Sequence, residues 1–386
     1  MGVLSGLKVL EFEAIGPAPF CGMVLADMGA DVIRVDRATA PEDLGIGRGE
    51  KRADVLKRNR RSVTLDMKSA DGVAAALDLI GKADVLLEGF RPGVMERLGL
   101  GPDVALARNP KLVYGRMTGW GQAGPMAPEV GHDINYIALT GVLAAIGPAG
   151  GKPTPPLNLV GDFGGGGMLL AVGVLGALFR AQRTGQGEVI DAAMVDGASL
   201  LSAPLWGLLA NGAWNETRGN NVLDGGAPWY DTYACKDGRY MAVGAIEARF
   251  YAALLERLGL AGEKLPAQHD RAGWPELRRR FSEVFLTRTR DEWAAWFAGS
   301  DACTSPVLTF TESLTHPHQT ARNARVTIDG VPQPSPAPRF RNAPSDTPRP
   351  PAGRGAGGGA ALKDWGFDAA GIARLKNLGL GWQESA

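Results

Sequence analysis

The sequence predicts an α/β protein, with a Rossmann-like parallel sheet in a large domain and a smaller α+β domain after it. Over about the first 200 residues, short runs rich in Val, Ile and Leu alternate with stretches of helical spacing. Strand–helix–strand alternation of this kind builds a parallel sheet that is covered on both faces. From about Gly225 this alternation ends, and the chain of 386 residues is long enough to bury a second core.

The predicted elements of the large domain follow one another along the chain. Runs of Val, Ile and Leu mark the strands, and apolar residues three or four positions apart mark the helices. We expect strands at Lys8–Glu13, Val32–Asp36, Val63–Asp66, Val85–Glu88, Leu112–Thr118 and Glu188–Asp191. We expect helices at Phe20–Met28, Gly72–Ile80, Pro92–Leu98, Phe163–Phe179 and Asp196–Trp214.

The chain is expected to divide into four parts. Residues 1–200 form the large domain, residues 201–225 a linker helix, and residues 226–320 the small α+β domain. Residues 321–386 form a return segment that completes the large domain. Within it, Val331–Gly359 is rich in Pro, Gly and Arg, so we expect it to be extended.

Charge and apolar content argue against two kinds of partner. Lys and Arg number 41, as do Asp and Glu, so the chain has no overall basic field for binding nucleic acid. The apolar run Phe163–Phe179 is close to the lower limit for spanning a bilayer. Because it contains six glycines and is flanked by Asp162 and Arg180, we interpret it as a buried core helix and expect no membrane partner.

The cysteines and the N-terminal residues indicate a location. Cys21, Cys235 and Cys303 are widely spaced and form no CxxC pair, which is typical of proteins in a reducing compartment. Acidic Glu11 and Glu13 interrupt the apolar run that a signal peptide would need. We therefore expect a cytoplasmic protein.

Two segments carry residues suited to proton transfer. His132, one of four histidines, lies between a glycine and an aspartate ahead of an apolar helix; imidazole exchanges protons near neutral pH, although a structural histidine would also fit there. Asp162 precedes four glycines and could be a plain N-cap. Alternatively, free N–H groups around Asp162–Gly165 would stabilise an enolate oxygen. His316 and His318 lack a third ligand nearby, so no metal site is expected.

Basic residues follow the predicted strands. Ligands of open α/β sheets bind at the carboxyl ends of the strands, and guanidinium groups there suit a phosphate-rich ligand. The residues concerned are Arg34 and Arg37, the cluster Lys57–Arg61, Lys68, Arg91 and Arg97. The turn at Gly16 lacks the GxGxxG spacing of nicotinamide-binding proteins, so no such cofactor is expected.

Ordered blocks of sequence resemble the type III CoA-transferase (CaiB/BaiF) family over nearly the whole chain. The blocks are Leu4–Leu10, Gly29–Asp36, Arg58–Lys68, Glu88–Gly93 and Tyr114–Gly121. Within the family, Gly131-His132-Asp133 and Gly161-Asp162 resemble the α-methylacyl-CoA racemase subfamily. Transferases of the family use an aspartate corresponding to Asp162 as a nucleophile and generally lack the histidine, so His132 favours racemisation over transfer.

The resemblance implies roles for further residues. Glu247 resembles a glutamate that reaches from the partner subunit to orient the histidine, and Tyr230 resembles a tyrosine that lines the same site. The positions matching the nucleotide end of CoA are Arg37, Lys68, Arg91 and Arg97, and those of the substrate site also include Asp133, Gly161 and Gly164. The family fold implies an interlocked homodimer.

The predicted function is therefore racemisation of 2-methylacyl-CoA thioesters at carbon 2, by proton removal and return through an enolate. His132 and Asp162 would exchange the protons, and Glu247 would orient His132. No cofactor or metal is expected, since CoA is part of the substrate and only a proton moves. Two alternatives stay open: a CoA transferase acting through an acyl-Asp162 anhydride, and a non-catalytic acyl-CoA-binding protein. The acyl chain is also left open.

Overall fold

The structure is a computed structural model that describes residues 2–39 and 51–383. The chain divides into two compact units. The first comprises Met1–Thr140, Leu157–Leu201 and Ala321–Ala386, and the second comprises Gly141–Pro156 and Ser202–Thr320. Residues 141–156, which we expected in the large domain, thus belong to the second unit.

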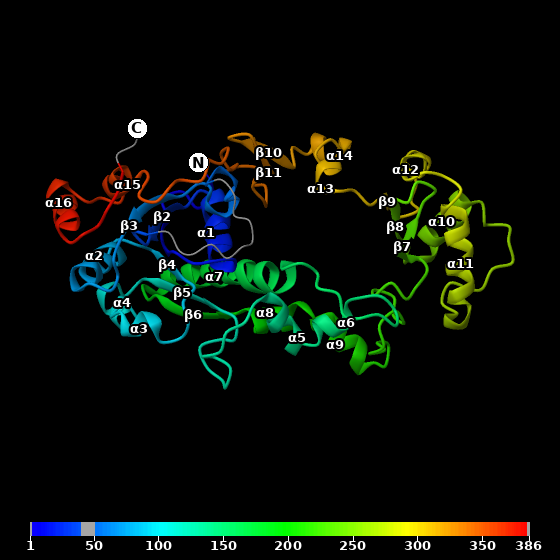
Figure 1. Cartoon of the computed structure of the whole chain (residues 1–386), viewed down its shortest axis with the longest axis horizontal. Coiled ribbons are helices and arrows are strands. Elements are labelled where there is room, and N and C mark those ends of the chain that lie inside the picture. Colours follow the sequence, from blue (N-terminus) through cyan, green and yellow to red (C-terminus); the bar gives the residue numbers. More distant parts are fainter. Residues whose placement is uncertain (1, 40–50, 384–386) are drawn as a thin grey trace. The chain divides into compact units, whose positions relative to one another are not determined.

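The first unit is built on a six-stranded parallel sheet, as the sequence predicted (Figure 1). Its strands are β1 Lys8–Phe12, β2 Asp31–Asp36, β3 Arg61–Thr64, β4 Val85–Glu88, β5 Val113–Thr118 and β6 Glu188–Ala193. They lie in the order β3-β2-β1-β4-β5-β6. The chain therefore moves outward in opposite directions from the adjacent strands β1 and β4, and ligands of such sheets bind at this switch point.

Helices cover both faces of this sheet. Alternate strand residues supply two cores, so that Val9 packs toward α1 and α7 while Leu10 packs toward α2 and α4. The helices are α1 Pro17–Asp27, α2 Ala70–Ile80, α3 Val94–Arg97, α4 Pro102–Arg108, α5 Asp133–Leu139, α7 Leu169–Thr184, α8 Met194–Leu201, α15 Gly358–Asp364 and α16 Ala369–Asn377. Shorter elements are η1 Lys51–Ala53, η2 Val55–Lys57, the π-helix η3 Leu159–Met168, and the hairpin β10 Arg325–Ile328 with β11 Val331–Pro334.

The C-terminal segment closes the sheet at β3. The Ser62 amide donates to the Ala356 carbonyl over 3.0 Å, and Thr64 and Gly381 exchange two backbone hydrogen bonds. Trp365 is fully buried in the same core as β1 and β2. Residues distant in sequence therefore complete the first unit, and Figure 1 shows α15 beside β3, with α16 next to α15 and further out.

The second unit is an α+β fold, again as predicted. Its antiparallel sheet has the order β7-β8-β9, with β7 Tyr230–Ala234, β8 Tyr240–Gly244 and β9 Thr304–Pro306. Buried aromatic side chains, among them Trp229, Phe281 and Phe285, form its core. Its helices are α6 Val142–Ala145, α9 Ala203–Ala210, α10 Ala248–Leu258, η4 Arg271–Gly273, α11 Trp274–Phe285, α12 Arg290–Phe297, α13 Phe310–Ser313 and α14 Pro317–Ala321.

The long helix expected at Asp196–Trp214 is wrong, and so is a linker helix across residues 201–225. The structure has two shorter helices instead, α8 ending at Leu201 and α9 beginning at Ala203. Pro204 stands in the first turn of α9, where its missing N–H is tolerated, but it cannot continue a helix from α8.

The apolar run predicted as a buried helix is only partly buried. Its inner face packs on the sheet, with Leu170 and Val174 fully buried. Its outer face leaves Met168, Val172 and Phe179 exposed by 45%, 60% and 63%. Among the residues described, Leu159–Thr184 is the one helical stretch whose length and apolar composition would suffice to cross a membrane. Core helices of soluble proteins meet the same criteria.

Glycines let the π-helix η3 approach its neighbours. A methyl group on Gly165 would lie 2.6 Å from the backbone nitrogen of Ala198 in α8, and one on Gly167 would lie 2.5 Å from the Pro17 carbonyl oxygen in α1. Across the same contact, a methyl group on Gly197 would lie 1.8 Å from the Gly165 oxygen. The glycine run therefore allows backbone to pack on backbone on both sides of η3.

We expect Gly197→Ala to destabilise the protein by about 1–3 kcal/mol or more, because the added methyl group meets backbone that cannot turn aside. Chemical denaturation followed by circular dichroism measures the change. Gly207→Ala in α9 is the matched control, since no atom lies within 4 Å of the added methyl group. Alanine favours helix there, so the control should keep or raise stability. Equal stability of the Gly197 variant and the native protein would contradict the packing.

Candidate active site

His132 is held at the N-terminus of α5. It is the N-cap residue of that helix, and its backbone N–H donates to Oδ1 of Asn135 over 3.0 Å. The Tyr136 hydroxyl donates to the Gly131 carbonyl, and the Tyr136 ring packs edge-on against Trp120 at 4.7 Å. These contacts fix the backbone on both sides of His132, while the imidazole itself is exposed.

Asp162 lies inside the first turn of η3, not at its N-cap. Asn158 is the N-cap residue, and its Nδ2 donates to Oδ2 of Asp162 over 3.0 Å. The Asp162 backbone N–H donates to Oδ2 of Asp133 over 2.8 Å. We expected the Asp162 N–H to be free to bind an enolate oxygen. This expectation is wrong, because the N–H is already hydrogen-bonded to the Asp133 carboxylate.

The carboxyl group of Asp162 is perturbed by its surroundings. Burial raises its pKa above the usual range, and the nearby charge of Asp133 adds to the rise. The hydrogen bond from Asn158 and the proximity of His132 act in the opposite direction. A carboxylate with a raised pKa is a stronger base than a free aspartate, which brings it closer to the range useful for proton transfer.

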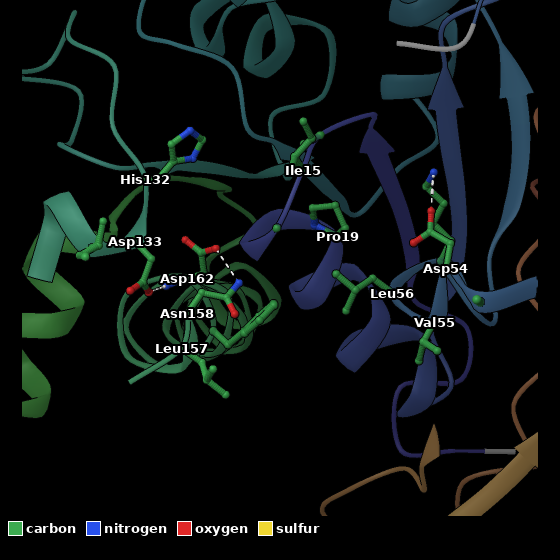
Figure 2. Close-up of a pocket in the computed structure, with 16 residues that line it drawn as sticks. Ile15, Pro19, Asp54, Val55, Leu56, His132, Asp133, Leu157, Asn158 and Asp162 are labelled. Atoms are coloured by element: carbon green, nitrogen blue, oxygen red, sulfur yellow. Dashed lines mark hydrogen bonds and ion pairs between the residues drawn. The ribbon is translucent and has the colours of Figure 1, made fainter. Parts of the chain in front are cut away.

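His132, Asp133 and Asp162 line one cavity of about 770 Å³. Figure 2 shows His132 and Asp162 on one side of it, with Ile15 and Pro19 further along and Leu56 beyond them. Gly16, after β1, has a φ of 71°, and a side chain there would lie 3.5 Å from Oδ2 of Asp162. The β1–α1 turn therefore runs directly past the carboxylate.

A second cavity of about 400 Å³ meets the first at Ile15 and His132, which line both. It lies at the switch point of the sheet, between the segments that follow β1 and β4, and Arg91 lines it. Met117 and Met194 are buried in its wall, whereas Met168 is exposed on η3. The His132 imidazole thus lies where two cavities with different lining residues join.

The basic residues predicted to hold the CoA nucleotide lie along the same edge of the sheet. Arg37 follows β2, Lys68 follows β3, and Arg91 follows β4, with Arg97 at the end of α3. All four are exposed. Arg354 of the return segment joins this edge, because it donates to the Arg37 carbonyl over 2.7 Å.

Two other predicted site residues belong to the second unit. Tyr230 begins β7 and pairs with Gly244 across the sheet, and Glu247 is the exposed N-cap residue of α10. Tyr230 lines a cavity of about 470 Å³ together with Cys303, and the charge of Glu247 contributes to raising the pKa of that thiol, after burial. The roles of Tyr230 and Glu247 stay predictions.

Gly161 and Gly164 support the site rather than line it. In the described part of the chain neither glycine lines either of the two cavities at His132. A methyl group on Gly161 would lie 2.5 Å from Oδ2 of Asp133, so this glycine makes room for the Asp133–Asp162 contact. Gly164 faces Leu201 within the same unit.

The sequence analysis missed Asn158, Ile15 and the η2 segment. Asn158 had a usable signal, because it precedes Asp162 by four residues, a helical spacing. Ile15 had none, and η2 had only Lys57, which the sequence places in a basic cluster without linking it to His132 or Asp162; the fold brings both segments to the cavity. Within residues 2–39 and 51–383, no group of three or more His, Cys, Asp or Glu side chains could hold a metal ion.

Comparison with known proteins places this chain in a family. The family model described as CoA-transferase family III matches residues 4–355, and the chain therefore belongs to that family. It is 49% identical over 345 residues to a mouse (Mus musculus) protein named alpha-methylacyl-CoA racemase, covering 89% of this chain and 88% of that protein. It is 47% identical over 344 residues to a human (Homo sapiens) protein of the same name, covering 89% and 87%.

A solved structure supports the fold. A CAIB/BAIF family protein from Brucella suis matches with a TM-score of 0.79 and 26% identity, covering 94% of this chain and 99% of that one. The resemblance predicted from the sequence blocks is thereby confirmed.

The contacts of Asp162 predict that two variants shift its pKa in opposite directions. Asn158→Ala removes a hydrogen bond that favours the charged carboxylate, so the Asp162 pKa should rise further. Asp133→Asn removes a negative charge and keeps an acceptor for the Asp162 N–H, so the pKa should fall. Carbon-13 NMR titration of the carboxyl, assigned with Asp162→Asn, measures both. Shifts in the same direction would contradict this electrostatic account.

Proposed function

We propose that this protein racemises 2-methylacyl-CoA thioesters at carbon 2. The two relatives named alpha-methylacyl-CoA racemase, each matched over most of both chains, bear out the prediction that it is an isomerase. The observation that carries the proposal is an imidazole and a carboxylate of raised pKa lining one cavity. Neither group has a metal-binding cluster around it in the described part of the chain.

The proposed mechanism uses two bases. One of His132 and Asp162 removes the proton of carbon 2, leaving an enolate, and the other returns a proton to the opposite face. The thioester would lie near His132, where the two cavities meet, with the CoA portion toward Arg91. No redox cofactor or metal enters this scheme, because only a proton moves. Asp133 holds the backbone of Asp162 and would act as a positioning residue.

We expect His132→Ala and Asp162→Asn each to lower racemisation by about 10²–10⁴-fold, the usual contribution of a positioned acid or base. Both should still bind free CoA in calorimetry. Because each variant keeps one base, residual deuterium exchange at carbon 2 should favour opposite enantiomers in the two variants. Nuclear magnetic resonance of separate (R)- and (S)-substrates in deuterated water follows this.

The matched control is His318→Ala, which removes an exposed imidazole in α14 and should leave the rates unchanged. Native exchange rates in both site variants would overturn the proposal. The alternatives have their own signatures: a transferase would give an acyl-Asp162 adduct with an acid acceptor, visible by mass, and a non-catalytic binding protein would bind CoA esters without exchange.

We further propose that the active form is a dimer of two copies. An apolar strip on the first unit supports this, since its side chains are each between 45% and 63% exposed. The strip consists of Leu159, Met168, Val172, Phe179, Leu200 and Leu201. Exposed apolar surface of this kind marks an interaction site. The resemblance to a family of interlocked dimers favours a second copy of this chain as the partner.

Light scattering should give a mass of twice 40.6 kDa for the native protein. Val172→Glu places a charge in the apolar strip and should lower both association and racemisation. Gln182→Glu adds a charge to the exposed end of the same helix outside the strip, and should change neither. A monomeric native protein would contradict the dimer. Binding of the native protein to lipid vesicles through the strip, without self-association, would also contradict it.

A further inference from the structure

The wall of the first cavity that faces the catalytic pair carries an ion pair. The Lys57 Nζ and the Asp54 Oδ2 lie 2.9 Å apart at the two ends of η2, and both residues line the cavity. Figure 2 shows Asp54 on the side away from His132 and Asp162. The cavity thus has His132 and Asp162 at one end and the Asp54–Lys57 ion pair at the other.

The lining between these two ends is apolar. Ile15, Pro19 and Leu56 form it. Val55 at the far end and Phe163, which follows Asp162 in the chain, add further apolar surface. An acyl chain that extends from carbon 2 into this cavity would therefore contact apolar side chains first and the polar Asp54 and Lys57 at its far end. The volume of about 770 Å³ lies in the range of cavities that enclose ligands of drug-like size, so a long chain or a ring system fits.

The partial exposure of this ion pair limits what it contributes to stability, although the charge of Asp54 also favours the charged forms of the buried Arg34 and Arg60. Its side chains are 20% and 25% exposed, and pairs near the surface contribute little to folding free energy. The pair does present two hydrogen-bonding functions to the cavity. The Lys57 ammonium has three N–H donors and uses one of them on Asp54, and the carboxylate of Asp54 offers several acceptor positions.

We propose that Asp54 and Lys57 recognise a hydroxyl group at the far end of the acyl chain. This inference rests on the proposed function, and it adds a specificity site to it. A hydroxyl oxygen accepts from Lys57 while its proton is donated to Asp54, and the charge balance of the pair is kept. A distal carboxylate would lie against Asp54, and a distal ammonium against Lys57. A plain alkyl end would displace water from both charged groups and could not replace the hydrogen bonds that the water made with them.

The consequence is a preference that can be measured. Sites that hydrogen-bond a substrate hydroxyl discriminate against the analogue that lacks it, since their polar groups are then left unpaired. Hydrogen bonds to charged groups correspond to about tenfold or more in binding. We expect kcat/KM for an ω-hydroxy-2-methylacyl-CoA to exceed that for the plain chain by about this factor.

The experiment compares matched substrates on the full-length protein. Racemisation of 2-methyldecanoyl-CoA and 2-methyldodecanoyl-CoA is measured beside their ω-hydroxy counterparts, and the ratio of kcat/KM values is the readout. Lys57→Met and Asp54→Leu should each lower this ratio toward one, because each removes one of the two hydrogen-bonding partners of the hydroxyl. Arg279→Met is the control, because it removes another ion pair of i,i+3 spacing, Glu276 with Arg279 on α11, and should keep the native ratio.

The outcomes separate this inference from the proposed function. Racemisation of all four substrates with the same ratio in the native protein and in both variants would overturn the specificity site and leave the function standing. Absence of any racemisation by the native protein would overturn both. Circular dichroism and CoA binding show whether a variant is folded, and the two variants act on different partners of the pair, so one misfolded variant leaves the other to decide.

Discussion

The position of Asp162 depends on the close approach of three helices without side chains between them. The π-helix η3 packs backbone to backbone on α8 through Gly165 and Gly197, and on α1 through Gly167. Because α1 follows β1 directly, this packing ties η3 to the carboxyl end of the central strand. The Asp162 carboxylate is then held beside the Gly16 turn, and α5 brings His132 to the same cavity. A helix with ordinary side chains could not lie so close.

A buried charge network links β1 to the residue that precedes β3. Arg60 and Glu11 form an ion pair whose side chains are fully buried, and desolvation raises the pKa of Glu11 and lowers that of Arg60. Such pairs add little net stability, but the loss of one partner leaves an uncompensated charge. Gly22 in α1 makes room for the pair, since a methyl group there would lie 2.2 Å from Glu11 Oε2.

The same network orders the return segment. Ser62 donates its hydroxyl to Asp36 over 2.6 Å and accepts from the Gly355 N–H over 2.8 Å, while Arg34 pairs with Asp36 and donates to the Ala352 carbonyl. Residues that end β2 and begin β3 therefore anchor a segment almost 300 positions later in the chain. This polar contact holds one chain segment at one sheet edge, because it gives hydrogen-bond partners to the buried Ser62 and Asp36 side chains.

Local patterns in the sequence determined the parallel sheet, most of its helices and the candidate pair of proton-transfer residues. Strand runs such as Val85–Glu88 are apolar enough to be buried on both faces, and His132 and Asp162 stand out beside glycines and helix starts. The tertiary structure alone decided the rest. It showed that Asp133 occupies the N–H of Asp162, that Asn158 donates to its carboxylate, and that Ile15 and η2 line the cavity. It also left the outer face of α7 exposed. The physical reason is that periodicity reports which face of an element is apolar, whereas contacts between segments distant in sequence depend on how those elements pack.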